Sequence, residues 1–81
     1  MLSNFRSKLE SQFKIFHWNP TQEQLIKIAK FLVQNPNNIN HATAFICELC
    51  DDVLLGIFEG VDNSDLNHLL AMAKLVAKEG S

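Results

Sequence analysis

The sequence predicts an all-α fold, either a compact four-helix bundle or an orthogonal array of four helices. Apolar residues recur at steps of three and four in four separate segments, and turn-forming residues separate those segments. No segment alternates apolar and polar residues in the way that a half-buried strand does. The chain has 81 residues, of which 47% are apolar, so residues 1–81 are expected to form one helical domain with its own core.

The first predicted helix covers residues 3–16. Its apolar residues are spaced so that they share one face, and they are Leu2, Phe5, Leu9, Phe13 and Phe16. Ile15 lies off that stripe. A turn follows, because Pro20 disfavours a helical conformation at the residue before it. Trp18 in this turn has two interpretations: it covers one end of the helices with its indole N–H bonded to a carbonyl, or it is an exposed anchor for a partner protein.

The second predicted helix covers residues 22–34. Thr21 is a suitable N-cap, and Gln24 stands at the spacing that completes a capping box. The main apolar stripe consists of Leu25, Ile28, Ala29 and Leu32. Phe31 falls outside this stripe, which makes it a candidate contact residue. The helix is expected to end at Asn35, because Asn35 precedes a proline.

The third predicted helix covers residues 41–59 and is unusually apolar. Taking about 100° per residue, its apolar side chains spread over about 220° of the helical wheel. A helix at a protein surface usually has an apolar stripe of roughly 100° or a little more. The remaining arc holds Leu55 and the acidic residues Glu48, Asp51, Asp52 and Glu59. We therefore expect this helix to be buried on two sides, with its acidic side exposed to solvent.

The fourth predicted helix covers residues 65–79. Asp62 or Ser64 is expected to cap it, and its stripe consists of Leu66, Leu69, Leu70, Ala73, Val76 and Ala77. Lys74 and Lys78 lie near its end, where positive charge favours the helix dipole. The connections between all four segments are short, so neighbouring helices are expected to pack as roughly antiparallel hairpins.

Charge is distributed unevenly along the chain, although the net charge is only −2. Residues 1–34 hold five basic and two acidic side chains, whereas residues 35–81 hold two basic and seven acidic ones. This asymmetry favours contacts between copies or with a charged partner, unless both parts are simply solvated. No run of 18 apolar residues predicts a membrane span, and no signal peptide precedes the domain. We therefore expect a cytoplasmic protein with reduced thiols and no membrane contact.

Cys47 and Cys50 form a C-x-x-C pattern that has three interpretations. Redox chemistry needs a thiolate near a helix N-terminus, and these residues fall in the middle of the third predicted helix. A zinc site needs two further ligands, and the spacing of the histidines predicts none. The preferred interpretation is that both are buried structural cysteines. Neither a metal nor another cofactor is predicted, and a metal- or thiol-dependent switch at this pair is the alternative.

The chain carries no recognisable catalytic pattern. It has neither a serine–histidine–acid grouping nor a glycine-rich phosphate loop, so we predict no enzyme. The acidic third helix argues against nucleic acid as a partner. We therefore predict a non-enzymatic protein–protein interaction module, a small regulator, adaptor or inhibitor, and a homodimer is the commonest way to cover its surplus apolar surface. The candidate contact residues are Trp18, Phe31, Glu48, Asp51, Asp52, Leu55 and Glu59.

Overall fold

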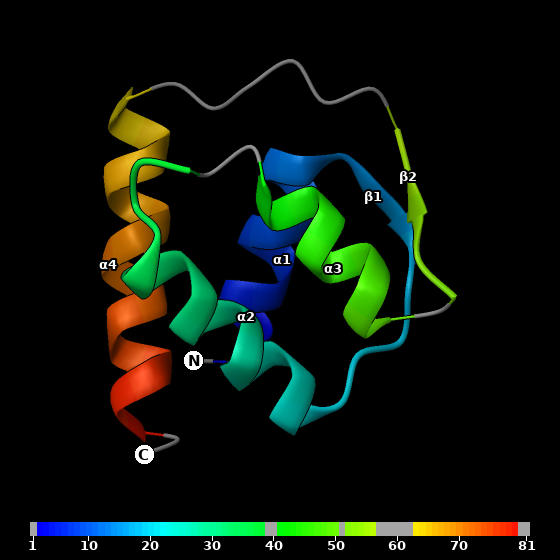
Figure 1. Cartoon of the computed structure of the whole chain (residues 1–81), viewed down its shortest axis with the longest axis horizontal. Coiled ribbons are helices and arrows are strands. Elements are labelled where there is room, and N and C mark those ends of the chain that lie inside the picture. The colour runs from blue at the N-terminus through cyan, green and yellow to red at the C-terminus, as the bar shows by residue number, and fades with distance from the viewer. Residues whose placement is uncertain (1, 39–40, 51, 57–62, 80–81) are drawn as a thin grey trace.

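A computed structural model of the chain describes residues 2–38, 41–50, 52–56 and 63–79. Within these ranges the chain is mostly helical and adds a two-stranded antiparallel sheet (Figure 1). The helices are α1 (Leu2–Phe13), α2 (Gln22–Gln34), α3 (Ala42–Leu49) and α4 (Asn63–Glu79), and the strands are β1 (Ile15–His17) and β2 (Leu54–Leu55). The predominance of helix is confirmed, whereas the sheet was not predicted.

Local signals alone account for α2. Its bounds agree with the prediction, and the predicted capping box is present. The Gln24 N–H donates to the Thr21 hydroxyl at 3.1 Å, and the Thr21 N–H donates to the Gln24 side-chain oxygen at 2.9 Å. At the other end, the Asn35 N–H and the Asn35 side-chain amide both donate to the Phe31 carbonyl, at 3.0 Å each. Both helix ends therefore find partners for backbone groups that a helix cannot satisfy itself.

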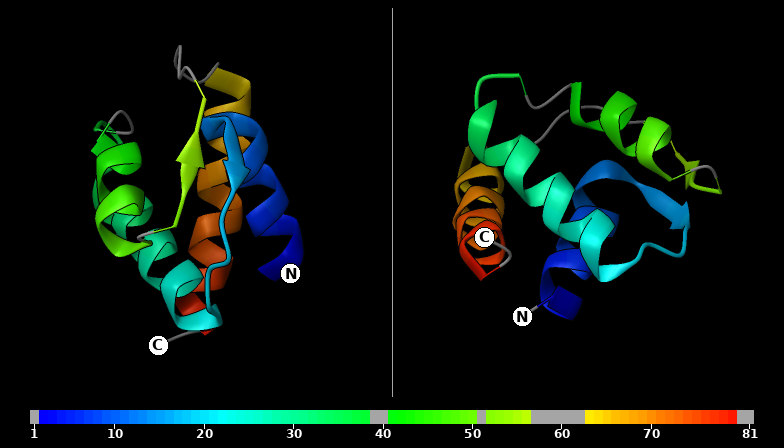
Figure 2. Two further views of the ribbon diagram at one scale, coloured as in Figure 1. Left: turned by 90° about the vertical axis from the view of Figure 1, so that its right-hand side faces the viewer. Right: turned by 60° about the horizontal axis from the view of Figure 1, so that its bottom comes forward.

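The core lies mainly where α1, α2 and α4 meet, and α3 adds Ala42 and Ile46 to it. The two views in Figure 2 place α2 across α4, with α1 beside them and α3 at the opposite side of α2. Most of the predicted stripe residues of these helices are buried there. The buried core side chains are Phe5, Leu9, Phe13, Ile15, Trp18, Leu25, Ile28, Ala29, Leu32, Ala42, Ile46, Cys50, Leu69, Ala73 and Val76. No described polar or charged residue is buried among them.

The prediction that the first helix continues to residue 16 is wrong, because α1 ends at Phe13. Lys14 adopts a left-handed conformation with φ at 57°, which a helix cannot continue through. From Ile15 onward the chain is a strand, so the helical spacing no longer decides which side chains are buried. Ile15, which lay off the predicted stripe, is buried, and Phe16, which lay on it, is exposed.

The prediction of one helix over residues 41–59 is also wrong, because α3 ends at Leu49. Cys50 is extended, with φ −121° and ψ 104°, and the side-chain amide of Gln24 donates to the Leu49 carbonyl at 3.1 Å. The chain then continues into β2, while residues 57–59 lie outside the described ranges. The apolar arc of about 220° therefore arose because a short helix and a strand were placed on a single helical wheel. The prediction that one long helix is buried on two sides is wrong for the same reason.

The β1–β2 ribbon joins two segments that are distant in sequence. Ile15 pairs with Leu55 and His17 pairs with Leu54, and the register shifts between these two pairs. Two β1 residues, Phe16 and His17, thus oppose Leu54 alone, which is the arrangement of a β-bulge. A bulge interrupts the alternation of inward and outward side chains, so Phe16 and His17 are both exposed after the buried Ile15.

Candidate functional site

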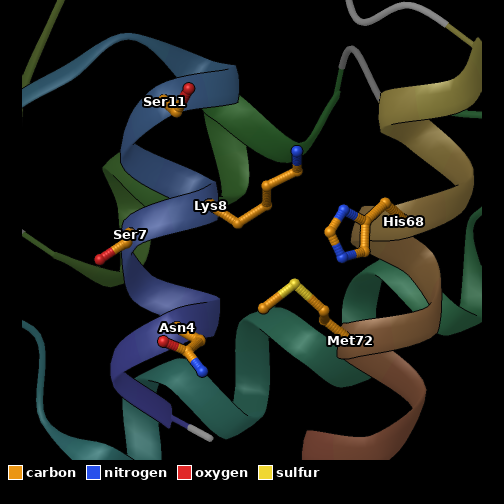
Figure 3. A pocket seen from close by; sticks show the side chains of 6 residues that line it. All are labelled: Asn4, Ser7, Lys8, Ser11, His68 and Met72. Atoms are coloured by element: carbon orange, nitrogen blue, oxygen red, sulfur yellow. The ribbon is translucent and has the colours of Figure 1, made fainter.

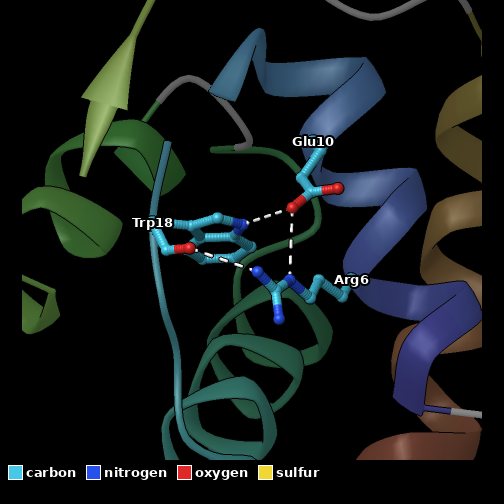
Figure 4. Close-up of polar contacts among 3 residues, drawn as sticks. All are labelled: Arg6, Glu10 and Trp18. Atoms are coloured by element: carbon cyan, nitrogen blue, oxygen red, sulfur yellow. Dashed lines mark hydrogen bonds and ion pairs between the residues drawn. The ribbon is translucent and has the colours of Figure 1, made fainter. Parts of the chain in front are cut away.

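A hydrogen-bonded cycle fixes the chain directly after β1 (Figure 4). The indole N–H of Trp18 donates to the Glu10 carboxylate at 2.7 Å, and the Arg6 guanidinium donates to the same oxygen at 3.2 Å. A second Arg6 nitrogen donates to the Trp18 carbonyl at 3.1 Å. Because Arg6 and Glu10 stand one turn apart on α1, the helix presents a matched donor and acceptor to one residue of the following segment.

Trp18 is therefore a packing residue in this structure. Only 4% of its surface is exposed, which agrees with the interpretation that the ring covers the helices. Its indole N–H donates to a carboxylate and not to the carbonyl that we expected. The ring belongs to the buried core, and its hydrogen bonds to α1 fix the chain directly after β1.

The outer face of the β1–β2 ribbon is formed by Phe16, His17 and Leu54. Phe16 is 79% exposed and Leu54 is 60% exposed, which makes them the two most exposed large apolar side chains among the described residues. Scattered exposed apolar residues need no explanation, but these two lie on neighbouring strands of one small sheet. The outer face of the ribbon is thus a local apolar surface in a molecule that buries most of its other large side chains.

Gly56 lets the Phe16 ring lie across the end of β2. A Cβ atom placed on Gly56 would come within 2.6 Å of a Phe16 ring carbon and 3.3 Å of the Lys14 Cβ. The Gly56 N–H also donates to the Lys14 carbonyl at 2.6 Å, which extends the pairing of the two segments. Glycine at this position therefore places the exposed ring against the backbone of β2.

Of the other predicted contact residues, two pack inside the fold, two are exposed, and two lie outside the described residues. Phe31 stacks on Phe45 of α3 with ring centroids 4.5 Å apart and planes 18° apart, so it joins α2 to α3. Leu55 is half-buried and packs against the core, on the inner side of the ribbon. Glu48 and Asp52 are exposed, as predicted for an acidic surface. Asp51 and Glu59 lie outside the described residues.

The two cysteines of the C-x-x-C pattern occupy different environments. Cys50 is buried in the core, whereas Cys47 is exposed on α3. The expectation that both are buried is thus wrong for Cys47. The part of the chain that the structure describes contains no group of three histidine, cysteine, aspartate or glutamate side chains that could hold a metal ion.

A hollow of about 400 Å³ lies between α1 and α4 (Figure 3). Lys8 and His68 project toward one another from the two helices, with Met72 beneath them, whereas Ser7 points away. The Lys8 ammonium contacts the Asp65 carboxylate at 3.5 Å. The main charge of this hollow therefore already has a partner, and its remaining polar groups do not converge on one point, as they would in a ligand site.

Searches for relatives identify no family for this chain: no family model, curated protein or solved structure matches it. In the described part of the chain, no helix is both long and apolar enough to cross a bilayer.

Sequence reasoning missed Phe16 and Leu54 as candidate contact residues. It assigned both to helices, and the apolar stripe of the first predicted helix placed Phe16 in the core. One signal was available, because Ile15-Phe16-His17-Trp18 is a short run rich in β-branched and aromatic residues, which favour strands. A run of this length is still too short to distinguish a strand from the last turn of a helix rich in aromatic residues.

Proposed function

We propose that this protein is a non-enzymatic interaction module that binds another protein through the outer face of the β1–β2 ribbon. The observation that carries the proposal is the exposure of Phe16 and Leu54 on adjacent strands. Aromatic side chains are enriched at the centres of protein interfaces, because they bring a large apolar area at a low cost in conformational entropy.

The size of the face predicts weak or transient binding. Full burial of one phenylalanine or leucine side chain contributes about 1.5–3 kcal/mol, whereas association costs about 4–15 kcal/mol in lost freedom of motion. Two anchors alone therefore leave little net affinity. A partner must add polar contacts around them, which is the usual arrangement of an apolar centre and a polar rim.

The charges beside the ribbon define the chemistry of the partner. Asp52 lies two residues before Leu54 and is exposed, and Glu48 is exposed on the helix that leads to this turn. A partner segment with an apolar side chain and a lysine or arginine matches the β2 side of this face, where Asp52 is exposed, while the exposed Lys14 beside β1 favours a carboxylate at the other side. The predicted apolar and acidic surface is retained in this proposal, but its apolar part is the ribbon and not the third helix.

We favour a different protein over a second copy as the occupant. A stable interface of standard size buries about 800 Å² on each partner, and a different protein whose surface is shaped to the ribbon can reach this area, whereas two identical ribbons meet over little more than two side chains each. A homodimer, expected from the sequence, would moreover bring two acidic borders into one small contact. Like charges in such a contact oppose association.

The test uses a double variant, Phe16→Ser with Leu54→Ser, and a matched control, Leu75→Ser. Leu75 is 51% exposed on α4, so the control removes a similar apolar side chain at a different place. Each protein is used to capture partners from native extract after chemical crosslinking, and the captured proteins are quantified by mass spectrometry. We expect at least one protein, crosslinked near the ribbon, that the double variant loses and the control retains.

Two outcomes would contradict this proposal. Equal capture by the double variant and the control would remove the ribbon as the binding face. A light-scattering mass of two chains that returns to one chain in the double variant would identify a second copy as the occupant. Circular dichroism of all variants verifies that the helices are intact.

One observation favours a second candidate function, a thiol-dependent switch. The exposed Cys47 lies one helical turn before the buried Cys50. A thiol reagent added to the native protein should then modify Cys47 rapidly and Cys50 only after unfolding. If Cys47 reacts no faster than a free cysteine in a peptide and its modification leaves partner binding unchanged, the thiol has no switching role.

A further inference from the structure

The β1–β2 ribbon is a sheet of two strands, so each strand has one edge without a strand partner. β1 lies between β2 and α1 in Figure 1 and in the left view of Figure 2, so the outer edge of β1 faces a helix. β2 lies at the margin of the molecule in Figure 1, and β1 is its main neighbour among the described elements. The outer edge of β2 is therefore the one that a partner can reach.

The pairing pattern directs the backbone of Leu55 toward this edge. The Gly56 N–H donates to the Lys14 carbonyl at 2.6 Å, so these two residues form a hydrogen-bonded pair of the ladder. Hydrogen-bonded and non-hydrogen-bonded pairs alternate in an antiparallel sheet, and the next pair is Ile15 with Leu55. The N–H and the C=O of Leu55 therefore point away from β1. In the described part of the chain, neither group has a hydrogen-bond partner.

The side chains of β2 separate the two faces of the ribbon. Leu54 is 60% exposed on the outer face, whereas Leu55 is half-buried and packs against the core. A strand added along β2 places its alternate side chains beside Leu54, because facing residues on neighbouring strands share one face of the sheet. The backbone of the same strand meets the N–H and the C=O of Leu55. One extended segment can thus occupy both the exposed face and the unpaired edge.

We propose that the partner of the ribbon binds as an extended segment that adds a third strand along the outer edge of β2. This inference rests on the proposed function of the ribbon and specifies the conformation of its partner. Phe16 and Leu54 alone give little net affinity, and strand addition supplies main-chain hydrogen bonds that complement them. The segment carries an apolar side chain beside Leu54 and a lysine or arginine near Asp52, which is exposed two residues before Leu54.

The probe is a phage-displayed library of random decapeptides, selected on the full-length protein. Peptides that bind this protein, but not the Phe16→Ser, Leu54→Ser double variant, depend on the ribbon. We expect their sequences to alternate apolar and polar residues, as strands with one buried face do, and to contain a basic residue. NMR of a synthetic peptide in the complex should show contacts between its backbone and that of Leu55, and slower hydrogen exchange of the Leu55 N–H.

Removal of one backbone donor distinguishes strand addition from other ways of binding the same face. A full-length chain is made by ligating residues 1–49 to a synthetic segment that begins at Cys50 and carries the change Leu55→N-methylleucine. This change keeps the side chain and replaces only the N–H at the outer edge. The affinity for ribbon-dependent peptides should fall about tenfold, because a hydrogen bond is lost.

The control for this change is the ligated chain with ordinary leucine at position 55. Protection of the Gly56 N–H from hydrogen exchange verifies in both chains that the ribbon is intact, because this group donates to Lys14. A chain with an ester in place of the Leu55 amide, which replaces the N–H by oxygen, provides the test if the N-methylated chain does not fold.

Three results would overturn the proposal. If ribbon-dependent peptides bind the N-methylated chain as tightly as the control, the ribbon remains the binding face but strand addition is wrong. If the selection yields no ribbon-dependent peptide, strand addition is also wrong, and capture from native extract decides the proposed function independently. A light-scattering mass of two chains for the control, and of one for the N-methylated chain, would assign the edge of β2 to a second copy.

Discussion

The helical core and the β1–β2 ribbon are held together by different kinds of contact. In α1, α2 and α4, side chains at helical spacing meet in one continuous core, and Leu9, Ile28 and Leu69 are fully buried. The ribbon has a two-residue strand and buries few side chains of its own, while Phe16 and Leu54 stay exposed. Stability therefore resides in the helices, and the surface suited to recognition lies on the segment that adds least to burial. Interaction sites on a rigid scaffold commonly have this division.

The largest difference between the two regions is expected from truncating leucines. Leu9→Ala should lower the free energy of unfolding by about 2–5 kcal/mol, because it leaves a cavity in the core. Leu54→Ala removes the same atoms from a surface that is 60% exposed and should change stability by less than about 0.5 kcal/mol. Urea unfolding, followed by circular dichroism, measures both. Equal losses would mean that the ribbon is an integral part of the core.

A smaller effect is expected at the junction of the two regions. Glu10→Ala removes the acceptor shared by Trp18 and Arg6 and should cost about 1–2 kcal/mol, after allowance for the partial exposure of Glu10. The control is Glu23→Ala, which breaks the ion pair between Glu23 and Lys27, also one helical turn apart. Because the Glu23 side chain is 80% exposed, its loss should lower the free energy of unfolding by about 0.5 kcal/mol or less. Trp18 is the only tryptophan, so its fluorescence also reports a local change. Unchanged emission and stability in Glu10→Ala would exclude an anchoring role for the cycle.

The predictability of each region follows from the range of the interactions that determine it. α2 was predicted with correct ends, because its capping box, its apolar spacing and the Asn35–Pro36 stop all act within a few residues. The burial of Ile15 and the exposure of Phe16 depend on pairing with Leu54 and Leu55, and no local pattern contains that information. The indole bond to Glu10 is likewise a tertiary contact, although the spacing of Arg6 and Glu10 is visible in the sequence.

The candidate site was the least predictable part. Glu48 and Asp52 were correctly expected to be exposed, because short acidic side chains are rarely buried without partners. Phe31 and Leu55 lay off their predicted stripes, and yet both found partners inside the fold, on α3 and in the ribbon. A residue off a helical stripe is thus not a reliable sign of an interface in a chain whose helices end earlier than predicted.

A third substitution tests the backbone at the start of the ribbon. Lys14→Gly should stabilise the protein by about 0.5 kcal/mol, because glycine relieves a left-handed strain of about 1–2 kcal/mol but adds freedom to the unfolded chain. The comparison is Ser7→Gly in the interior of α1, which should destabilise by about 0.5 kcal/mol. Thermal unfolding of the two variants gives opposite signs if Lys14 is strained, and the same sign if it is not.

The smallest effect on stability is expected at Gly56. Gly56→Ala should change the free energy of unfolding by less than about 0.5 kcal/mol, because the exposed Phe16 ring can move aside and the Lys14 Cβ, 3.3 Å from the added methyl group, has to give only slightly. The ring of Phe16 should nevertheless shift, which NMR contacts between the ring and residue 56 would reveal. An unchanged ring position in Gly56→Ala would mean that the position of the Phe16 ring does not depend on the missing Cβ atom at residue 56.

The pairing of Ile15 with Leu55 has a consequence for the order in which the protein forms. During translation, β1 is synthesised well before β2, because α2 and α3 lie between the two strands in the chain. α1 and α2 depend on nearby residues and form early, whereas closing a long loop between distant segments is slow. Ile15 therefore lacks its strand partner until the chain has grown past Leu55, and the ribbon forms after the local contacts of α1 and α2.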